Sequence, residues 1–181
     1  MKVISGTLKG RTIEGYDIDG TRPTMDRVKE SVFATIQEHI KDSTVLDLFA
    51  GSGSLGIEAI SNGAKLCYFI DNNNEVIKAL NRTITNFNIK DKSKIILSDW
   101  KKFLNESSKN NIKFDLIFID PPYNYDVYEK ILTKVSELNL LNEFGLIIIE
   151  HQNLKLKDEY NNLKLYKQKK YGNKSVNIYK N

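Results

Sequence analysis

The sequence predicts an α/β domain built on a doubly wound, mostly parallel β-sheet that ends in an antiparallel hairpin. Short apolar runs of strand length alternate with amphipathic helical segments through the middle of the chain. A glycine-rich turn joins the first of these strands to the helix that follows it. Near the C-terminus, two strand-like runs flank Gly172 and Asn173, which is typical of a closing hairpin.

The elements follow in order along the chain. Residues 1–18 are expected to form short strands around Gly6 and Gly10, an N-terminal β-hairpin arm. A helix is predicted from Thr24, placed to cap it, to Ile40. The predicted parallel strands are 45–49, 66–70, 94–97, 114–119 and 146–149, with helices at 54–62, 75–87 and 126–138. The hairpin strands are 163–171 and 175–179, so the arm (1–20) and the core (21–181) form a single domain, 1–181.

Composition excludes several classes of protein. The chain of 181 residues is 40% hydrophobic, which is enough for a buried core. No apolar run reaches the length of a membrane helix, and the polar N-terminus does not fit a signal peptide. A single cysteine, Cys67, and two histidines, His39 and His151, argue against disulfides and against a metal centre. We therefore expect a soluble, cytoplasmic protein without metal.

The positive charge is unevenly distributed. The net charge is +4, but residues 151–181 hold eight lysines against Asp158 and Glu159. Three of the four arginines, Arg11, Arg22 and Arg27, lie within the first 27 residues. Guanidinium groups bind phosphate through two parallel hydrogen bonds, which lysine cannot reproduce. This distribution favours a polyanionic partner such as nucleic acid, although an ordinary solvated surface would also explain it.

The glycine-rich turn predicts a nucleotide cofactor. Gly51, Gly53 and Gly56 match the G-x-G-x-x-G spacing after a strand, and Asp71 follows at the end of the next strand, where it could bind ribose hydroxyls. The turn alone fits either a nicotinamide dinucleotide or S-adenosylmethionine (SAM). Asp47 precedes the glycines and would disfavour a pyrophosphate but favour the ammonium and sulfonium of SAM.

A second motif, Asp120-Pro121-Pro122-Tyr123, follows the predicted strand 114–119 at the edge where parallel sheets bind ligands. The prolines have no N–H groups, so this turn offers only acceptors, from the Asp120 carboxylate and the Pro121 carbonyl. Tyr123 supplies a ring on which a base could stack. Two acceptors beside a stacking ring fit the exocyclic amino group of a nucleobase.

These two motifs resemble those of SAM-dependent methyltransferases that act on adenine N6, cytosine N4 or guanine N2. The segments Thr21-Arg22-Pro23-Thr24 and 27–33, the start at 4–11 and the end at 171–179 are similar to the bacterial 16S rRNA guanine-N2 methyltransferases, over essentially the whole chain. Lys29 and Asn173-Lys174 depart from the pattern typical of that family.

The resemblance implies a Rossmann-like class I methyltransferase fold and SAM as cofactor. The catalytic residues would be Asp120, Pro121, Pro122 and Tyr123. The cofactor would be held by Asp47, Phe49, Gly51, Ser52, Gly53, Asp71, Asn72, Asp99, Trp100, Pro23 and Thr24, where Asp99 could also be a helix cap, and Asn72 a cap of the helix after the second strand. Glu150 and His151 end the strand 146–149 near the ligand, but we assign them no catalytic role.

The implied reaction is direct in-line methyl transfer to a guanine N2 in rRNA of the small ribosomal subunit or of an assembly intermediate, by a monomer. RNA would contact Lys9, Arg11, Arg22, Arg27, Lys169 and Lys170. Three alternatives remain open: a DNA adenine-N6 methyltransferase, a nicotinamide-dependent oxidoreductase, and a non-catalytic RNA-binding or assembly module. The first usually needs an additional DNA-reading domain, and Asp47 and the Asp120 turn disfavour the second.

Overall fold

The computed structural model describes residues 1–14, 22–121, 125–152 and 154–181, and the side chains of these residues except 22–25, 125 and 126. The helices are α1 (Arg22–Ile36), α2 (Ser54–Ser61), α3 (Asn74–Asn86), α4 (Trp100–Lys109) and α5 (Tyr125–Glu137). The strands are β1 (Thr44–Asp47), β2 (Leu66–Asp71), β3 (Ser93–Leu97), β4 (Phe114–Ile119), β5 (Leu141–Gln152), β6 (Glu159–Tyr160), β7 (Leu163–Tyr171) and β8 (Lys174–Lys180).

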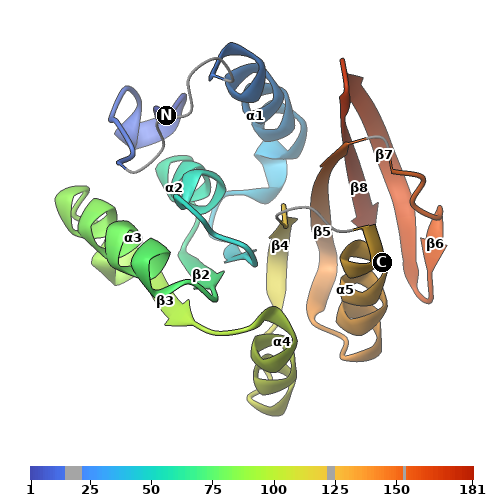
Figure 1. Ribbon diagram of the computed structural model, residues 1–181. Helices are drawn as coiled ribbons and strands as arrows, with labels where there is room; N and C mark the ends of the chain where they lie inside the picture. Colours follow the sequence, from blue (N-terminus) through green and yellow to red (C-terminus); the bar gives the residue numbers. More distant parts are fainter. Residues whose placement is uncertain (15–21, 122–124, 153) are drawn as a thin grey trace.

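The described strands form one sheet in the order β3-β2-β1-β4-β5-β8-β7-β6. The five strands from β3 to β5 are parallel, whereas β8, β7 and β6 join antiparallel. The strand order reverses direction between β1 and β4, which is the point where doubly wound sheets bind ligands. The predicted fold class is therefore confirmed, including the closing hairpin (Figure 1).

The helices cover both faces of the sheet (Figure 1). Apolar residues of α1, α2 and α3 pack in one buried cluster with Val45, Phe69 and Phe118. Those of α4 and α5 pack in a second cluster with residues such as Leu46 and Ile117. Successive strand residues point to opposite faces, so each parallel strand supplies both clusters and is apolar throughout.

The N-terminal arm differs from the prediction. Instead of a hairpin of two strands, residues 1–14 contain a short 3₁₀ helix, Gly6–Leu8, and an isolated bridge between Lys2 and Thr12. The two ends of the arm pair antiparallel, since the Val3 N–H donates to Arg11 and the Ile13 N–H to Met1. Between them, the N–H groups of Ile4 and Ser5 donate to Glu58 of α2 and not to a neighbouring strand. Gly6 lies so close to α2 that a Cβ atom there would meet the Ser61 carbonyl oxygen at 1.9 Å.

Three further predictions need correction. Helix α1 begins at Arg22, so Thr24 lies inside it and is not its cap. Helix α4 was not predicted, although Phe103, Leu104 and Ser107 form its buried face. Strand β5 is longer than 146–149, because it continues pairing with β8 as far as Gln152. No helix among the described residues is both long and apolar enough to cross a membrane.

Candidate active site

The glycine-rich loop connects the end of β1 to the start of α2. Gly51 and Gly53 have φ angles of 51° and 77°, a left-handed conformation that favours glycine. A Cβ atom at Gly53 would meet Leu80 Cδ1 at 2.4 Å, and one at Gly56 would meet Phe69 Cε1 at 2.3 Å. At Gly51 a Cβ would meet only the Phe49 carbonyl oxygen, at 4.0 Å. Gly53 and Gly56 therefore allow close packing, whereas Gly51 faces open space in which a ligand can lie.

Two aspartates hold this loop in place. The Gly51 N–H donates to Asp71 Oδ2 at 3.0 Å, and the Gly56 N–H donates to Asp47 Oδ2 at 3.0 Å. Asp71 Oδ1 accepts a second backbone N–H, from Asn73 at 2.9 Å. Asp47 is buried, with 3% of the residue exposed, while Asp71 is half-buried. Asp71 can therefore still reach a ligand, and each of its oxygens keeps a lone pair for ribose hydroxyls.

Four acidic residues lie at the carboxyl ends of four neighbouring parallel strands. Asp47 is in register with Phe69 of β2 and with Phe118 of β4. Asp71 lies two residues after Phe69, and Asp120 lies two residues after Phe118. Their side chains therefore point to the same face of the sheet as that of Asp47. Ile119 is in register with Ile149, which places Glu150 beside Asp120. We name Asp71, Asp47, Asp120 and Glu150 the carboxylate row.

Burial and repulsion between like charges raise the pKa values of two residues of this row, Asp47 and Asp120. The pKa of Asp47 rises from 3.8 to about 8, chiefly because the group is buried; the Gly56 N–H opposes this rise, and the charges of Asp120 and Asp71 add to it. Neighbouring protein atoms remove water from the Asp120 carboxylate and so raise its pKa from 3.8 to about 7. The charge of Glu150 adds to this rise, and that of Lys174 opposes it. Asp120 is nevertheless exposed to solvent. At neutral pH Asp47, and Asp120 in part, therefore hold protons that a cationic ligand would displace.

The residues assigned to the adenosine follow β1 and β2 or lie at the start of α4. Asp99 caps α4, since Oδ1 accepts from the N–H groups of Lys101 at 2.8 Å and Lys102 at 3.3 Å. Trp100 and Phe49 are partly buried against the cluster of α4 and α5. Asn72 is exposed and does not cap α3, because the capping side chain is that of Asn73. The alternative of Asn72 as a cap was therefore wrong by one residue.

Some predicted site residues cannot be placed in full. Pro122 and Tyr123 lie outside the described residues. Arg22, Pro23 and Thr24 belong to the first turns of α1, but their side chains are not described. Pro121 is buried directly after β4, next to Asp120.

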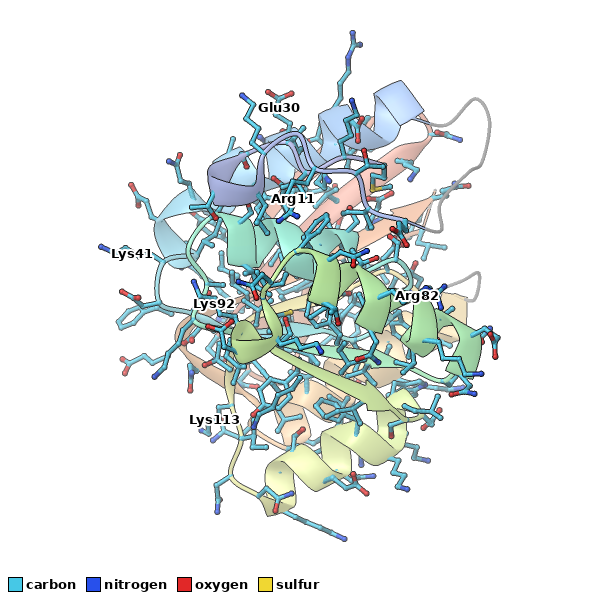
Figure 2. All side chains as sticks on the ribbon, turned by 90° about the vertical axis from the view of Figure 1, so that its left-hand side faces the viewer. Arg11, Glu30, Lys41, Arg82, Lys92 and Lys113 are labelled. Atoms are coloured by element: carbon cyan, nitrogen blue, oxygen red, sulfur yellow. The ribbon has the colours of Figure 1, made fainter. Side chains whose placement is uncertain are left out.

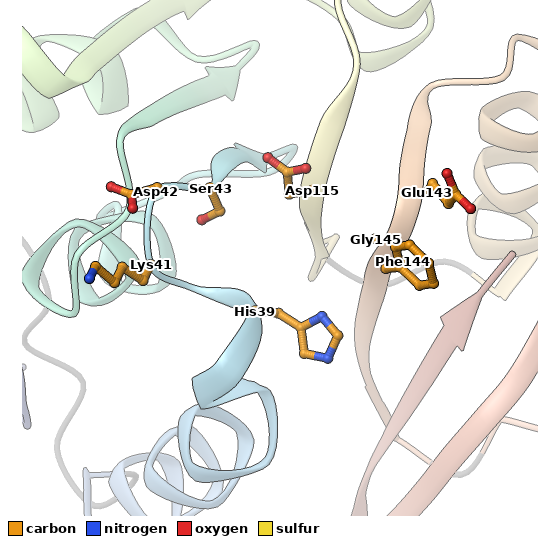
Figure 3. Close-up of a pocket in the computed structure, with 8 residues that line it drawn as sticks. All are labelled: His39, Lys41, Asp42, Ser43, Asp115, Glu143, Phe144 and Gly145. Carbon is orange, nitrogen blue, oxygen red and sulfur yellow. The ribbon is translucent and has the colours of Figure 1, made fainter.

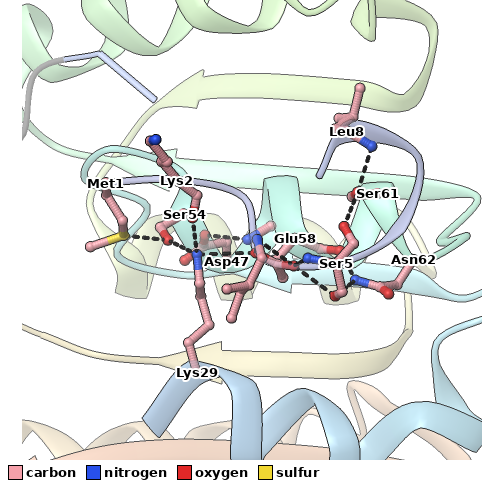
Figure 4. A network of polar contacts seen from close by, with 12 residues as sticks. Met1, Lys2, Ser5, Leu8, Lys29, Asp47, Ser54, Glu58, Ser61 and Asn62 are labelled. Atoms are coloured by element: carbon pink, nitrogen blue, oxygen red, sulfur yellow. Dashed lines mark hydrogen bonds and ion pairs between the residues drawn. The ribbon is translucent and has the colours of Figure 1, made fainter. Parts of the chain in front are cut away.

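A buried polar network joins the N-terminal arm, α1 and α2 beside the glycine loop (Figure 4). Lys29 and Glu58 form an ion pair at 3.0 Å, and their side chains are 5% and 0% exposed. Lys29 Nζ also donates to Ser54 Oγ at 3.1 Å, at the first residue of α2. This network fixes α1 against the helix that follows the glycine loop. Sequence analysis noted Lys29 only as a departure from the family and did not identify its partner.

The basic residues assigned to RNA have different surroundings. Arg11 reaches the end of α3 (Figure 2), where it donates to the carbonyl oxygens of Asn86 at 2.8 Å and Phe87 at 3.2 Å. Lys169 donates to Ser31 and Thr35 on α1. Lys9, Arg27 and Lys170 are exposed. Arg11 and Lys169 thus have internal partners, and their contact with RNA stays a prediction.

A cavity of about 220 Å³ among the described residues lies elsewhere (Figure 3). It is lined by His39, Lys41, Asp42, Ser43, Asp115, Glu143, Phe144 and Gly145. These residues precede β1, begin β4 and belong to the first part of β5, so the cavity is at the amino edge of the sheet. The glycine loop and the carboxylate row are at the carboxyl edge, which is the edge that binds ligands in this class of sheet. Also within the described residues, no cluster of three or more His, Cys, Asp or Glu is arranged to hold a metal.

Comparisons with known proteins identify the family of this chain. Residues 1–180 match the family model described as "Conserved hypothetical protein 95". The Bacillus subtilis protein YlbH, named provisionally as an rRNA methyltransferase, is 36% identical over 99% of this chain and 98% of its own. The Haemophilus influenzae "Ribosomal RNA small subunit methyltransferase D" is 32% identical over 100% of this chain and 94% of its own.

A solved structure of the Escherichia coli protein yhhF, also named provisionally as a methyltransferase, has a TM-score of 0.86 and 26% identity, covering 99% of this chain and 96% of that one. The resemblance found in the motifs is thus confirmed across the whole chain. The chain belongs to the "Conserved hypothetical protein 95" family and, within the relatives compared, to the bacterial small-subunit rRNA methyltransferases.

Proposed function

We propose that this protein transfers a methyl group from SAM to the N2 amino group of a guanine in rRNA of the small ribosomal subunit. The observation that carries the proposal is the carboxylate row beside the glycine loop. A row of acids in which Asp47 and Asp120 have raised pKa values favours a ligand that brings positive charge and amino groups. The names of the relatives support rRNA as the substrate.

The described residues fit SAM. The open side of Gly51 leaves room for the cofactor against the backbone. Asp71 would accept from the ribose hydroxyls, while Asp99 and Trp100 would lie beside the adenine. Asp47 would favour the cationic end of the cofactor. A dinucleotide would instead bring a negatively charged pyrophosphate to the same carboxylates, so the nicotinamide alternative is disfavoured.

The protein's own contribution to the reaction is to hold the base and its developing charge. The guanine amino group is a weak nucleophile because its lone pair is delocalised into the ring. The Asp120 carboxylate and the Pro121 carbonyl would accept its two hydrogens and turn the lone pair toward the methyl carbon. As the N–C bond forms and the methyl–sulfur bond breaks, positive charge grows on the nitrogen beside Asp120.

The amino nitrogen must then lose one proton. Asp120 lies beside it and, with a pKa of about 7, can accept this proton and release it to solvent. The products are the N2-methylated guanine and S-adenosylhomocysteine (SAH), with one proton released in total. No covalent bond between the enzyme and its substrate is needed.

The direct test is to incubate the protein and radiolabelled SAM with small ribosomal subunits from cells that lack the gene, and with their free 16S rRNA. Nuclease digestion and mass spectrometry then identify the modified nucleoside. We expect N2-methylguanosine at one site. Transfer only to N6 of adenine in DNA would favour the DNA methyltransferase, and SAM binding without any transfer would favour an assembly module.

A further inference from the structure

Three charged side chains follow one another across the edge of the sheet where β4, β5 and β8 meet. Asp120 and Glu150 come directly after the registered pair Ile119 and Ile149 of two parallel strands. Lys174 begins β8 opposite Gln152 of β5, and its Nζ donates to Glu150 Oε1. The order across the sheet is therefore carboxylate, carboxylate, ammonium.

All three side chains lie on the face of the sheet that α1 covers. Alternate residues of each strand, such as Phe118, Ile148 and Val176, pack in the cluster of α1, α2 and α3. Asp120, Glu150 and Lys174 are each two residues from one of these, so they point the same way. The charges of Glu150 and Lys174 both act on the pKa of Asp120, in opposite directions, which agrees with close approach.

The Glu150–Lys174 ion pair has groups left over for a ligand. Among the described residues it uses one carboxylate oxygen and one of three ammonium hydrogens. The two side chains are 21% and 19% exposed, so they are accessible from the site but partly removed from water. A hydrogen bond made there discriminates between ligands better than one made in full solvent.

We propose that Glu150 and Lys174 identify the target base as guanine. The pairing edge of guanine presents, in order, the N2 amino hydrogens, the N1 hydrogen and the O6 acceptor. A carboxylate only accepts hydrogen bonds and an ammonium only donates them. With N2 held at Asp120, Glu150 accepts from N1–H and Lys174 donates to O6. This inference rests on the proposed function and deepens it by naming the residues that select the base.

The same arrangement rejects the other two bases that carry an amino group. Next to the amino group, adenine has an unprotonated N1 and cytosine an unprotonated N3, and both are acceptors. Either base would place this acceptor against the Glu150 carboxylate, which leaves two acceptors facing each other. The Asp-Pro-Pro-Tyr motif resembles that of enzymes acting on any of the three amino groups, so we assign the selection to residues beside it.

The test compares guanine with 2,6-diaminopurine at the nucleotide that the enzyme methylates in synthetic rRNA. Both bases carry the 2-amino group, but diaminopurine has an acceptor at N1 and an amino group in place of O6. The wild-type protein is expected to prefer guanine in kcat/KM by about 10- to 100-fold, the range for two specific hydrogen bonds to a base edge. Glu150→Gln can donate to N1 through its amide, so its preference for guanine is expected to fall about tenfold.

The further variants and the control use the same ratio of kcat/KM, which is unaffected by a loss of folded protein. Lys174→Met is expected to lower the preference, and Lys174→Arg to retain most of it. Glu129→Gln, the control, breaks an ion pair of similar kind with Lys157 at 3.5 Å and should keep the wild-type ratio. An unchanged ratio in both Glu150→Gln and Lys174→Met, with guanine N2 still methylated, would show that the pair only braces β5 against β8 and would overturn the inference. Absence of N2 methylation by the wild-type protein would instead refute the proposed function.

Discussion

Glu58 and Asp47, two buried acidic residues on the elements that flank the glycine loop, have opposite surroundings. Glu58 of α2 is 0% exposed and is fully partnered by the protein: it accepts from the N–H groups of Ile4 and Ser5 and pairs with Lys29. Asp47 of β1 is 3% exposed, accepts from the Gly56 N–H, and has acidic neighbours in Asp71 and Asp120. The ion-paired carboxylate stabilises the fold, whereas the one whose charged neighbours are acids is, in our proposal, kept for a cationic ligand.

The largest effect is expected from removing the partnered acid. Glu58→Ala leaves the Lys29 ammonium buried without its partner, so the free energy of unfolding should fall by about 3–5 kcal/mol. Urea unfolding measures it. The matched control is Glu75→Ala, which breaks the exposed pair of Glu75 with Lys78 and should cost less than about 1 kcal/mol. Equal costs for the two variants would contradict the structural role of Glu58.

The second-largest effect is expected on catalysis, at the carboxylate row. Asp120→Ala should lower kcat about 100- to 1000-fold, because the acceptor beside the developing charge is lost. SAM affinity, measured by calorimetry, should change little. Because Asp120 acts as the ionised carboxylate and its pKa is about 7, wild-type activity should fall as the pH drops below that value. Full turnover by Asp120→Ala would refute the proposed mechanism.

The third effect concerns the cofactor. Asp71→Ala should weaken SAM binding by about 1–3 kcal/mol, because the ribose loses a charged hydrogen-bond acceptor and the Gly51 N–H loses its partner. Asp71→Asn keeps one acceptor oxygen for the loop and separates the two causes. Unchanged SAM affinity in both variants would mean that Asp71 serves only the loop and the turn before α3.

The smallest expected effect is on stability, which should fall as the pH rises, opposite to the usual effect of a carboxylate. The folded state raises the pKa of Asp47 to about 8, so it binds a proton more tightly than the unfolded chain does, and stability is lost as the pH rises from about 4 to 8. Asp47→Asn keeps an acceptor for Gly56 but cannot ionise. Without cofactor, this variant should be more stable than wild type at pH 8 by about 1 kcal/mol or more, and similar to it at pH 4. Thermal unfolding at both pH values measures the difference, and a variant that is less stable at pH 8 would contradict the account.

Most of the fold could be predicted because the parallel strands are short, apolar and separated by clear turns. Strand β7 was predicted with its observed limits, 163–171, and the glycine turn was located correctly. The arm was predicted only in part: its ends pair antiparallel, but the backbone of Ile4 and Ser5 is satisfied by Glu58, a residue more than 50 positions away that no local pattern reveals. Helix α4 could have been found from the Asp99 cap and the apolar pair Phe103 and Leu104.

Only part of the candidate site could be predicted, because the rest depends on contacts between residues distant in the sequence. Strand ends mark Asp47, Asp71 and Asp120, and motif spacing connects them. Lys174 becomes a neighbour of Glu150 only because β8 pairs antiparallel with β5, and sequence periodicity does not determine which strands pair. Arg11 was assigned to phosphate because arginine is scarce in this chain, yet the structure also gives it the exposed carbonyls at the end of α3.

The central claim, that the carboxylate row is held for a cation, is tested most directly by counting protons released on cofactor binding. Calorimetric titrations at pH 7 in two buffers of different ionisation enthalpy give this number for SAM and for SAH, which has the same amino group but no sulfonium charge. Since Asp47 holds a proton near this pH, SAM should release more protons than SAH, and the difference should shrink in Asp47→Asn. Equal proton release for SAM and SAH would contradict the claim.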